Sequence, residues 1–142
     1  MTEISSEQAI ARARTALGVP ESVAARAFRV ERLDAPAAAY FLVLFSSGGR
    51  VRHVATIDAG TGALQDDADI AGDHLMLTRE QAIAAAGLGG AAQAKLVWRP
   101  GPASRSSLYP IWEISSPKRR RYVDQQGQLW DVLPSSGRGG GP

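Results

Sequence analysis

The chain has 142 residues, of which 44% are hydrophobic and 21% charged, with a formal net charge of +2 and no cysteine. This composition is typical of a globular protein and excludes disorder of the whole chain. The length suffices for one domain or for two very small units that share a core. The lack of cysteine excludes disulfides, thiolate metal sites and cysteine nucleophiles. Because no apolar run approaches the roughly 18 residues of a membrane span and no signal-peptide pattern opens the chain, we expect a cytoplasmic protein without membrane association.

An N-terminal helix is predicted from Ser5 to about residue 17. The Ser5 side chain can accept hydrogen bonds from amides of the first turn, and Gln8, three residues later, can reach back to the Ser5 amide. This pattern is a capping box. Gly18 follows the last expected helical residue and predicts the end of the helix.

Three or four antiparallel strands are predicted to follow. Residues 24–33, 39–45 and 50–58 are rich in β-branched, aromatic and other apolar side chains, and the glycine-rich stretch between the last two indicates a hairpin. A turn at residues 58–62 and a short strand at residues 63–64 complete this half of the chain.

The second half repeats this order. Thr78 and Gln81 form another capping-box pattern, and Gly87 predicts the end of that helix. Expected strands then cover residues 91–99, 108–115, 119–124 and 128–132, with a turn at 124–127.

Matching segments support an internal repeat. Ile4–Ala11 aligns with Leu77–Ala84 around a shared Glu-Gln-Ala-Ile-Ala run, and the Gly-x-Leu that begins at Gly62 aligns with the one at Gly127. Tyr40 aligns with Tyr109. The offset between matching residues shrinks along the chain, so the length differences fall in loops.

The capped helix with its Glu-Gln-Ala-Ile-Ala run, the aromatic strand "YPIWEIS" and the turn "YVDQQGQLW" resemble the PepSY domain, a small helix-plus-sheet module with a cystatin-like shape. The resemblance implies an α+β fold of two tandem repeats, each with an N-terminal helix packed on a meander of three or four antiparallel strands. The expected boundaries are 1–65 for the first repeat, 66–76 for an acidic linker, 77–134 for the second repeat and 135–142 for a disordered glycine-rich tail.

No residue pattern predicts catalysis or a cofactor. His53 lies in an expected strand between valine and arginine neighbours, and His74 lies in the expected linker. Asp66, Asp67 and Asp69 precede Asp73 and His74, but their spacing does not fit a calcium loop, so we expect a solvated linker and no metal site.

Two surfaces are candidates for partner binding. The expected strand 39–45 is apolar on both faces, and only one face can pack on its own helix. The other face is either covered within the chain or free to bind a partner, and at the matching strand Glu113 replaces Leu44, which predicts shallower burial there.

The basic run 118–121 is either a charged, edge-protecting strand or a binding surface. The resulting candidate residues are Tyr40, Leu42, Leu44, Tyr109, Ile111, Arg119 and Arg121.

The expected function is non-catalytic binding of a protein partner, and the resemblance implies an inhibitor or modulator of a peptidase or another protein. Three alternatives stay open: a binder of nucleic acid or an anionic surface through Arg50, Arg52 and residues 118–121; an immunity-type protein that neutralises a toxin; and an enzyme with an unrecognised site. The expected oligomeric state is a monomer or a homodimer.

Overall fold

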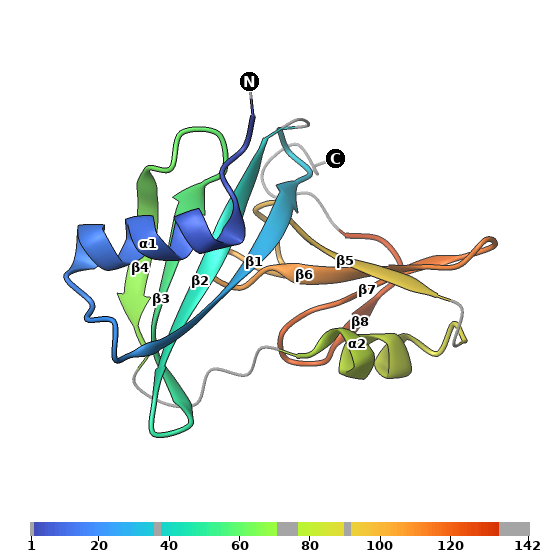
Figure 1. The fold of residues 1–142 in the computed structure, drawn as a ribbon. Coiled ribbons are helices and arrows are strands. Elements are labelled where there is room, and N and C mark those ends of the chain that lie inside the picture. The colour runs from blue at the N-terminus through green and yellow to red at the C-terminus, as the bar shows by residue number, and fades with distance from the viewer. Residues whose placement is uncertain (1, 36–37, 71–76, 90–91, 134–142) are drawn as a thin grey trace. The chain divides into compact units, whose positions relative to one another are not determined.

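The structure is a computed structural model that describes residues 2–35, 38–70, 77–89 and 92–133, and it has an α+β fold (Figure 1). The chain divides into two units, Met1–His74 (unit 1) and Leu75–Pro142 (unit 2). Each unit contains a helix followed by four antiparallel strands.

Unit 1 is a helix on an antiparallel meander. Consecutive strands pair with each other, so their order in the sheet is β4-β3-β2-β1. Its elements are α1 (Ser6–Leu17), β1 (Ala24–Arg32), β2 (Ala39–Ser47), β3 (Arg50–Asp58) and β4 (Leu64–Asp69).

Helix α1 begins and ends as its local sequence predicts. The Gln8 amide donates to Ser5 Oγ at 3.1 Å, and the Ser5 amide donates to Gln8 Oε1 at 2.8 Å, which completes the capping box. Gly18 adopts a left-handed conformation with φ of 69°, which ends the helix at low steric cost.

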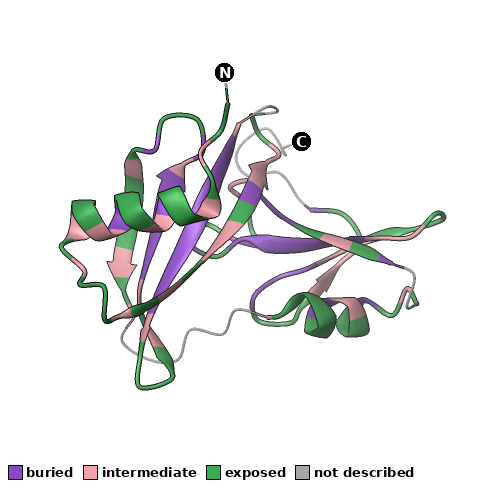
Figure 2. Ribbon diagram, in the orientation of Figure 1, coloured by how far each residue is buried: buried purple, intermediate pink, exposed green. Residues whose placement is uncertain are grey.

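The core of unit 1 lies between α1 and one face of its sheet. Ala9 and Ala13 of the helix pack with alternate residues of β2, namely Phe41, Val43 and Phe45. Small residues on the helix let it approach the aromatic side chains of the sheet closely. Figure 1 shows α1 lying across this face, and Figure 2 shows buried positions concentrated along β2.

Unit 2 has the same element order with shorter elements. Its sheet order is β5-β6-β7-β8, again with antiparallel neighbours. The elements are α2 (Arg79–Ala86), β5 (Gln93–Trp98), β6 (Ile111–Ser115), β7 (Arg120–Val123) and β8 (Leu129–Trp130).

Helix α2 also carries the expected capping box. The Gln81 amide donates to Thr78 Oγ1 at 3.0 Å, and the Thr78 amide donates to Gln81 Oε1 at 2.9 Å. The helix packs on β5, β6 and β7, and its buried residues are Ala82 and Ala86.

The acidic segment differs from its prediction. Residues 66–69 belong to β4 and pair with β3, with Asp67 opposite Ala55 and Asp69 opposite His53, so they are not a linker. Aspartate is depleted in β-strands in general, but the backbone hydrogen bonds with β3 outweigh this low strand propensity. Residues 71–76 of the expected linker and the tail 135–142 lie outside the described residues.

Candidate functional site

The apolar residues predicted for partner binding in unit 1 are buried. Tyr40, Leu42 and Leu44 alternate along β2 with the residues that face α1, and their exposed fractions are 1%, 0% and 0%. Burial raises the pKa of the Tyr40 phenol above its usual value. These side chains have the burial of core residues, and partner binding through them stays a prediction.

The matching residues of unit 2 divide into buried and exposed. Ile111 is 1% exposed, whereas Tyr109, which precedes β6, is 39% exposed. Glu113 is less deeply buried than its counterpart Leu44, as predicted, but the difference is small, because the exposed fractions are 8% and 0%. Lys95 lies opposite it on β5, with Nζ 3.7 Å from Glu113 Oε1, and this cationic neighbour lets a carboxylate occupy a buried position.

Arg121 has a structural role that sequence patterns did not indicate. As predicted from strand alternation, Arg119 and Arg121 share a side, and both lie near Asp131 Oδ1, at 3.6 and 3.1 Å. Arg121 Nη1 also donates to the carbonyl oxygen of Ala86 at 2.9 Å, at the last residue of α2. Arg121 therefore ties the helix to the sheet, while the Arg119 side chain remains 59% exposed.

The loop between β6 and β7 presents the exposed cations of unit 2. We call residues 116–120 the basic tip. The Ser116 amide donates to the carbonyl oxygen of Arg119 at 2.8 Å, and the Arg119 amide donates to Ser116 Oγ at 3.2 Å, so the turn is closed by its own hydrogen bonds. Pro117 restricts φ within it.

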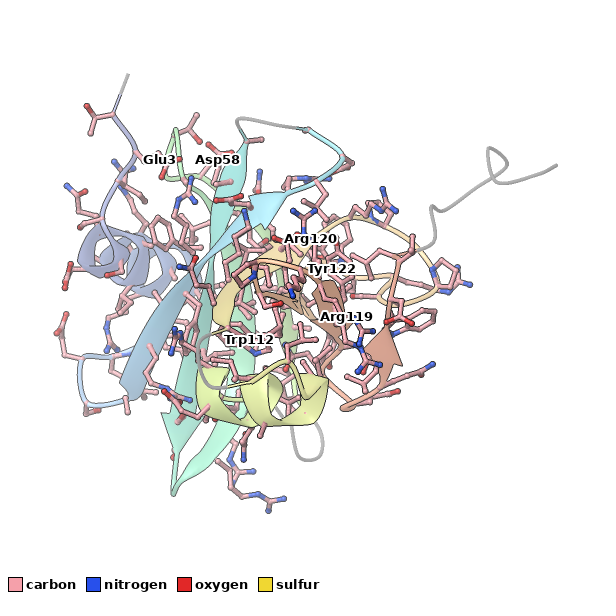
Figure 3. The ribbon with its side chains drawn as sticks, turned by 90° about the vertical axis from the view of Figure 1, so that its right-hand side faces the viewer. Glu3, Asp58, Trp112, Arg119, Arg120 and Tyr122 are labelled. Carbon is pink, nitrogen blue, oxygen red and sulfur yellow. The ribbon has the colours of Figure 1, made fainter. Side chains whose placement is uncertain are left out.

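Three cationic side chains are exposed at the basic tip: Lys118, Arg119 and Arg120. Among the described residues, neither Lys118 nor Arg120 has an ion-pair partner. Residues 115–120 line a shallow depression of about 250 Å³. Figure 3 labels Arg119, Arg120 and Tyr122 in this part of unit 2, and Figure 2 colours the loop as exposed.

His53 contacts two aspartates of the acidic segment, which the sequence patterns did not indicate. His53 Nδ1 lies 2.6 Å from Asp69 Oδ1, and His53 Nε2 lies 2.7 Å from Asp67 Oδ2. The two carboxylates approach opposite sides of the ring and do not converge on one point, and no group of three potential ligands that could hold a metal ion occurs in the described ranges. Asp73 and His74 lie outside those ranges.

The turn after β7 contains a buried carboxylate. Asp124 Oδ1 accepts from the amides of Gln126 and Gln128, each at 2.9 Å, and Oδ2 accepts from Trp130 Nε1 at 3.0 Å. Asp124 is 5% exposed. These three donors stabilise the turn, and the Asp-x-x-Gly pattern that predicted a turn was the only sequence signal for them.

A depression of about 340 Å³ lies beside this turn, formed with the loop 102–109. Its polar side chains bond within the protein: Ser104 Oγ donates to the Tyr109 carbonyl oxygen at 2.6 Å, and Gln125 Nε2 donates to the Pro110 carbonyl oxygen at 2.7 Å. The second bond joins the turn to the backbone that precedes β6.

Comparison of the chain with protein-family models, curated proteins and solved structures gave no match. The PepSY resemblance accordingly stays a prediction. In the part of the chain that the structure describes, no helix combines the length and apolar character needed to cross a membrane.

Proposed function

We propose that the chain is a non-catalytic protein-binding module, built as two tandem PepSY-like repeats, that inhibits or modulates a protein partner in the cytoplasm. Its binding surface is the basic tip of unit 2, and the partner presents an acidic surface to it. The observation that carries the proposal is the exposure of Lys118 and Arg120 without ion-pair partners among the described residues.

The repeat proposal draws support from matched details in the two units. Both helices begin with a capping box, at Ser5 and at Thr78. Both third strands end at an aspartate turn that contains a glycine of positive φ, 79° at Gly62 and 86° at Gly127. Such agreement over the whole element order is what duplication of one unit would produce.

The non-catalytic proposal draws support from the internal hydrogen bonds of two titratable side chains, His53 and Asp124. Both ring nitrogens of His53 contact carboxylates, and the oxygens of Asp124 accept three internal hydrogen bonds. A general base needs an acceptor that is available to the substrate. The described histidine and the buried aspartate are engaged inside the protein.

Charge and exposure favour an acidic protein surface as the partner. Lysine and arginine side chains at the rim of an interface steer an oppositely charged partner and raise its association rate. Tyr109 is 39% exposed in the same unit, and exposed tyrosine is frequent at protein interfaces.

The structure also bears on the nucleic-acid alternative. A single-strand binding surface combines a basic groove with aromatic side chains on which bases stack. Arg121 is engaged with Asp131 and with α2, so it contributes less to such a surface than the sequence run indicates. We therefore favour the protein partner and treat nucleic acid as an outcome of the test.

The test uses charge reversal at the tip with a control of equal charge. Full-length wild type, the double variant Lys118→Glu/Arg120→Glu and the control Arg12→Glu/Arg26→Glu are immobilised and exposed to lysate of the source cells. Arg12 and Arg26 are exposed residues of unit 1. Retained proteins are identified by mass spectrometry, purified and titrated against each variant, and a DNA duplex is titrated in parallel at two salt concentrations.

We expect a protein that binds wild type and the control equally and binds the tip variant roughly tenfold more weakly or worse. Equal retention by the tip variant would contradict the assigned surface. Retention of no protein, together with salt-sensitive DNA binding lost in the tip variant, would replace the proposal with the nucleic-acid alternative.

A further inference from the structure

His53 and two aspartates join the edge strand of unit 1 to its neighbour. His53 lies on β3, and Asp67 and Asp69 lie on β4, which is the last strand of the order β4-β3-β2-β1. In the register of the two strands His53 pairs with Asp69, and Asp67 is its diagonal neighbour on the same side of the sheet.

The geometry of these contacts favours a protonated ring. A neutral imidazole has one N–H and can donate only one hydrogen bond, whereas an imidazolium donates from both nitrogens. Here Nδ1 lies 2.6 Å from a carboxylate oxygen of Asp69, and Nε2 lies 2.7 Å from one of Asp67. Such short distances are a feature of charge-assisted hydrogen bonds. Two carboxylate acceptors are satisfied together only by the imidazolium.

We propose that protonated His53 is a pH-sensitive latch that holds edge strand β4 on β3, and that its deprotonation loosens β4. Loss of one proton removes one of the two donors and leaves a carboxylate facing a ring nitrogen lone pair. The effect is local, because the other β4 contacts do not depend on this proton: the backbone ladder with β3, the hydrogen bond from Gln65 Nε2 to Asp58 Oδ1, and the packing of Leu64 on the core.

The surroundings of His53 add few other charges. From β2 the residue opposite His53 is the uncharged Phe45. From α1 the charged group on this face is Arg14, whose guanidinium lies 5.7 Å from the Phe45 ring centroid and donates to the carbonyl oxygens of Pro20 and Val23. On β3 itself, Arg52 is the adjacent charged residue and alternates to the other face. Asp67 and Asp69 are thus the charges that contact the ring.

The direction of the pH dependence follows from these contacts. Partial burial acts to lower the pKa of His53, but the hydrogen bonds that the ring donates to Asp69 and Asp67 outweigh it, so the pKa is raised above its usual value. A raised folded-state pKa means that the stabilisation is complete below the unfolded value of about 6.5 and is lost as pH rises through the folded-state value. The latch is therefore closed below about pH 6.5 and opens as the pH rises through the folded-state pKa of His53.

The experiment measures the ring and the strand separately in the full-length protein. NMR of the imidazole signals follows protonation of His53 between about pH 5.5 and 9, with a His74→Gln variant to assign the signals of the two histidines. Hydrogen exchange of the β4 amides, corrected for the intrinsic effect of pH, follows opening of the strand. The variants are Asp67→Asn and the matched control Asp66→Asn, which makes the same charge change on the opposite side of β4.

We expect His53 to titrate above 6.5 and the opening constant of β4 to rise on the order of three- to tenfold across that titration, because the pair is partly exposed. Asp67→Asn lowers the titration midpoint of His53 and reduces the pH dependence of β4 opening, while Asp66→Asn leaves both close to wild type. A wild-type His53 that titrates at or below its ordinary value, or a β4 strand whose opening is independent of that titration, would overturn the proposal. Both of these decisive results come from wild type, so they do not depend on the folding of a variant.

Discussion

The two units have one element order but differ in how that order is stabilised. In unit 1, β1, β2 and β3 each have nine residues and α1 has twelve, so long backbone ladders and an apolar face hold the unit together. In unit 2, α2 has eight residues and β6 and β7 have five and four. Shorter elements bury less apolar surface and form fewer ladder bonds.

Unit 2 compensates with side chains that bond to backbone of distant segments. Trp112 Nε1 donates to the Leu77 carbonyl oxygen at 2.8 Å, and Gln125 Oε1 accepts from the Leu77 amide at 3.0 Å. At the corresponding place in unit 1, the Ile4 amide donates to the backbone carbonyl oxygen of Ala59 at 2.9 Å. The same junction between helix start and sheet turn is thus closed by backbone in one unit and by side chains in the other.

The comparison can be tested unit by unit, because all three tryptophans, Trp98, Trp112 and Trp130, belong to unit 2. Tryptophan fluorescence during urea unfolding reports unit 2, and far-UV circular dichroism reports both units. The variants below are ordered from the largest expected loss of stability to the smallest.

The aspartate turns should show the largest difference. Asp124→Ala removes a buried carboxylate and leaves three donors without their acceptor, and we expect a loss of about 2–3 kcal/mol in the free energy of unfolding seen by tryptophan fluorescence. Asp58→Ala removes the acceptor of the Gly60 and Thr61 amides in a half-buried turn, with an expected loss of about 1 kcal/mol. Equal losses would contradict a greater dependence of unit 2 on polar side chains.

The turn glycines should give smaller and more similar losses. Alanine at Gly62 or Gly127 must adopt a positive φ, which costs about 1–2 kcal/mol. A Cβ at Gly62 would also lie 3.1 Å from Arg12 Cζ, whereas one at Gly127 meets nothing within 4 Å. We expect Gly62→Ala to be the more costly by a few tenths of a kcal/mol, and the Arg12→Ala background to remove that excess in paired urea titrations.

The capping boxes should give the smallest losses. Ser5→Ala and Thr78→Ala each remove one N-cap acceptor, at about 1 kcal/mol. Ser6→Ala is the control for Ser5, because the Ser6 hydroxyl bonds to the neighbouring Glu7 side chain. Hydrogen exchange of the helix amides should show the larger local effect in α2, since a two-turn helix has fewer remaining bonds. Equal effects of Ser5→Ala and Ser6→Ala would rule out the cap as the cause.

The sequence by itself determined the features that depend on neighbours within a few positions. Both capping boxes, the glycine that ends each helix, the hairpin at Gly48 and Gly49 and the aspartate turns were predicted from short patterns and are confirmed. The side shared by Arg119 and Arg121 was likewise predicted, because strand alternation is a local property.

Tertiary structure decided the features that depend on residues far apart in the chain. The burial of Tyr40, Leu42 and Leu44, the buried place of Glu113 and the extension of β4 through the acidic segment all depend on which segments lie alongside. Arg121 bonds to Ala86, 35 residues away, and His53 bonds to aspartates 14 and 16 residues away. A short sequence window records the side chains that can form such bonds, but only the folded chain selects the partner, because partner choice depends on strand register and burial.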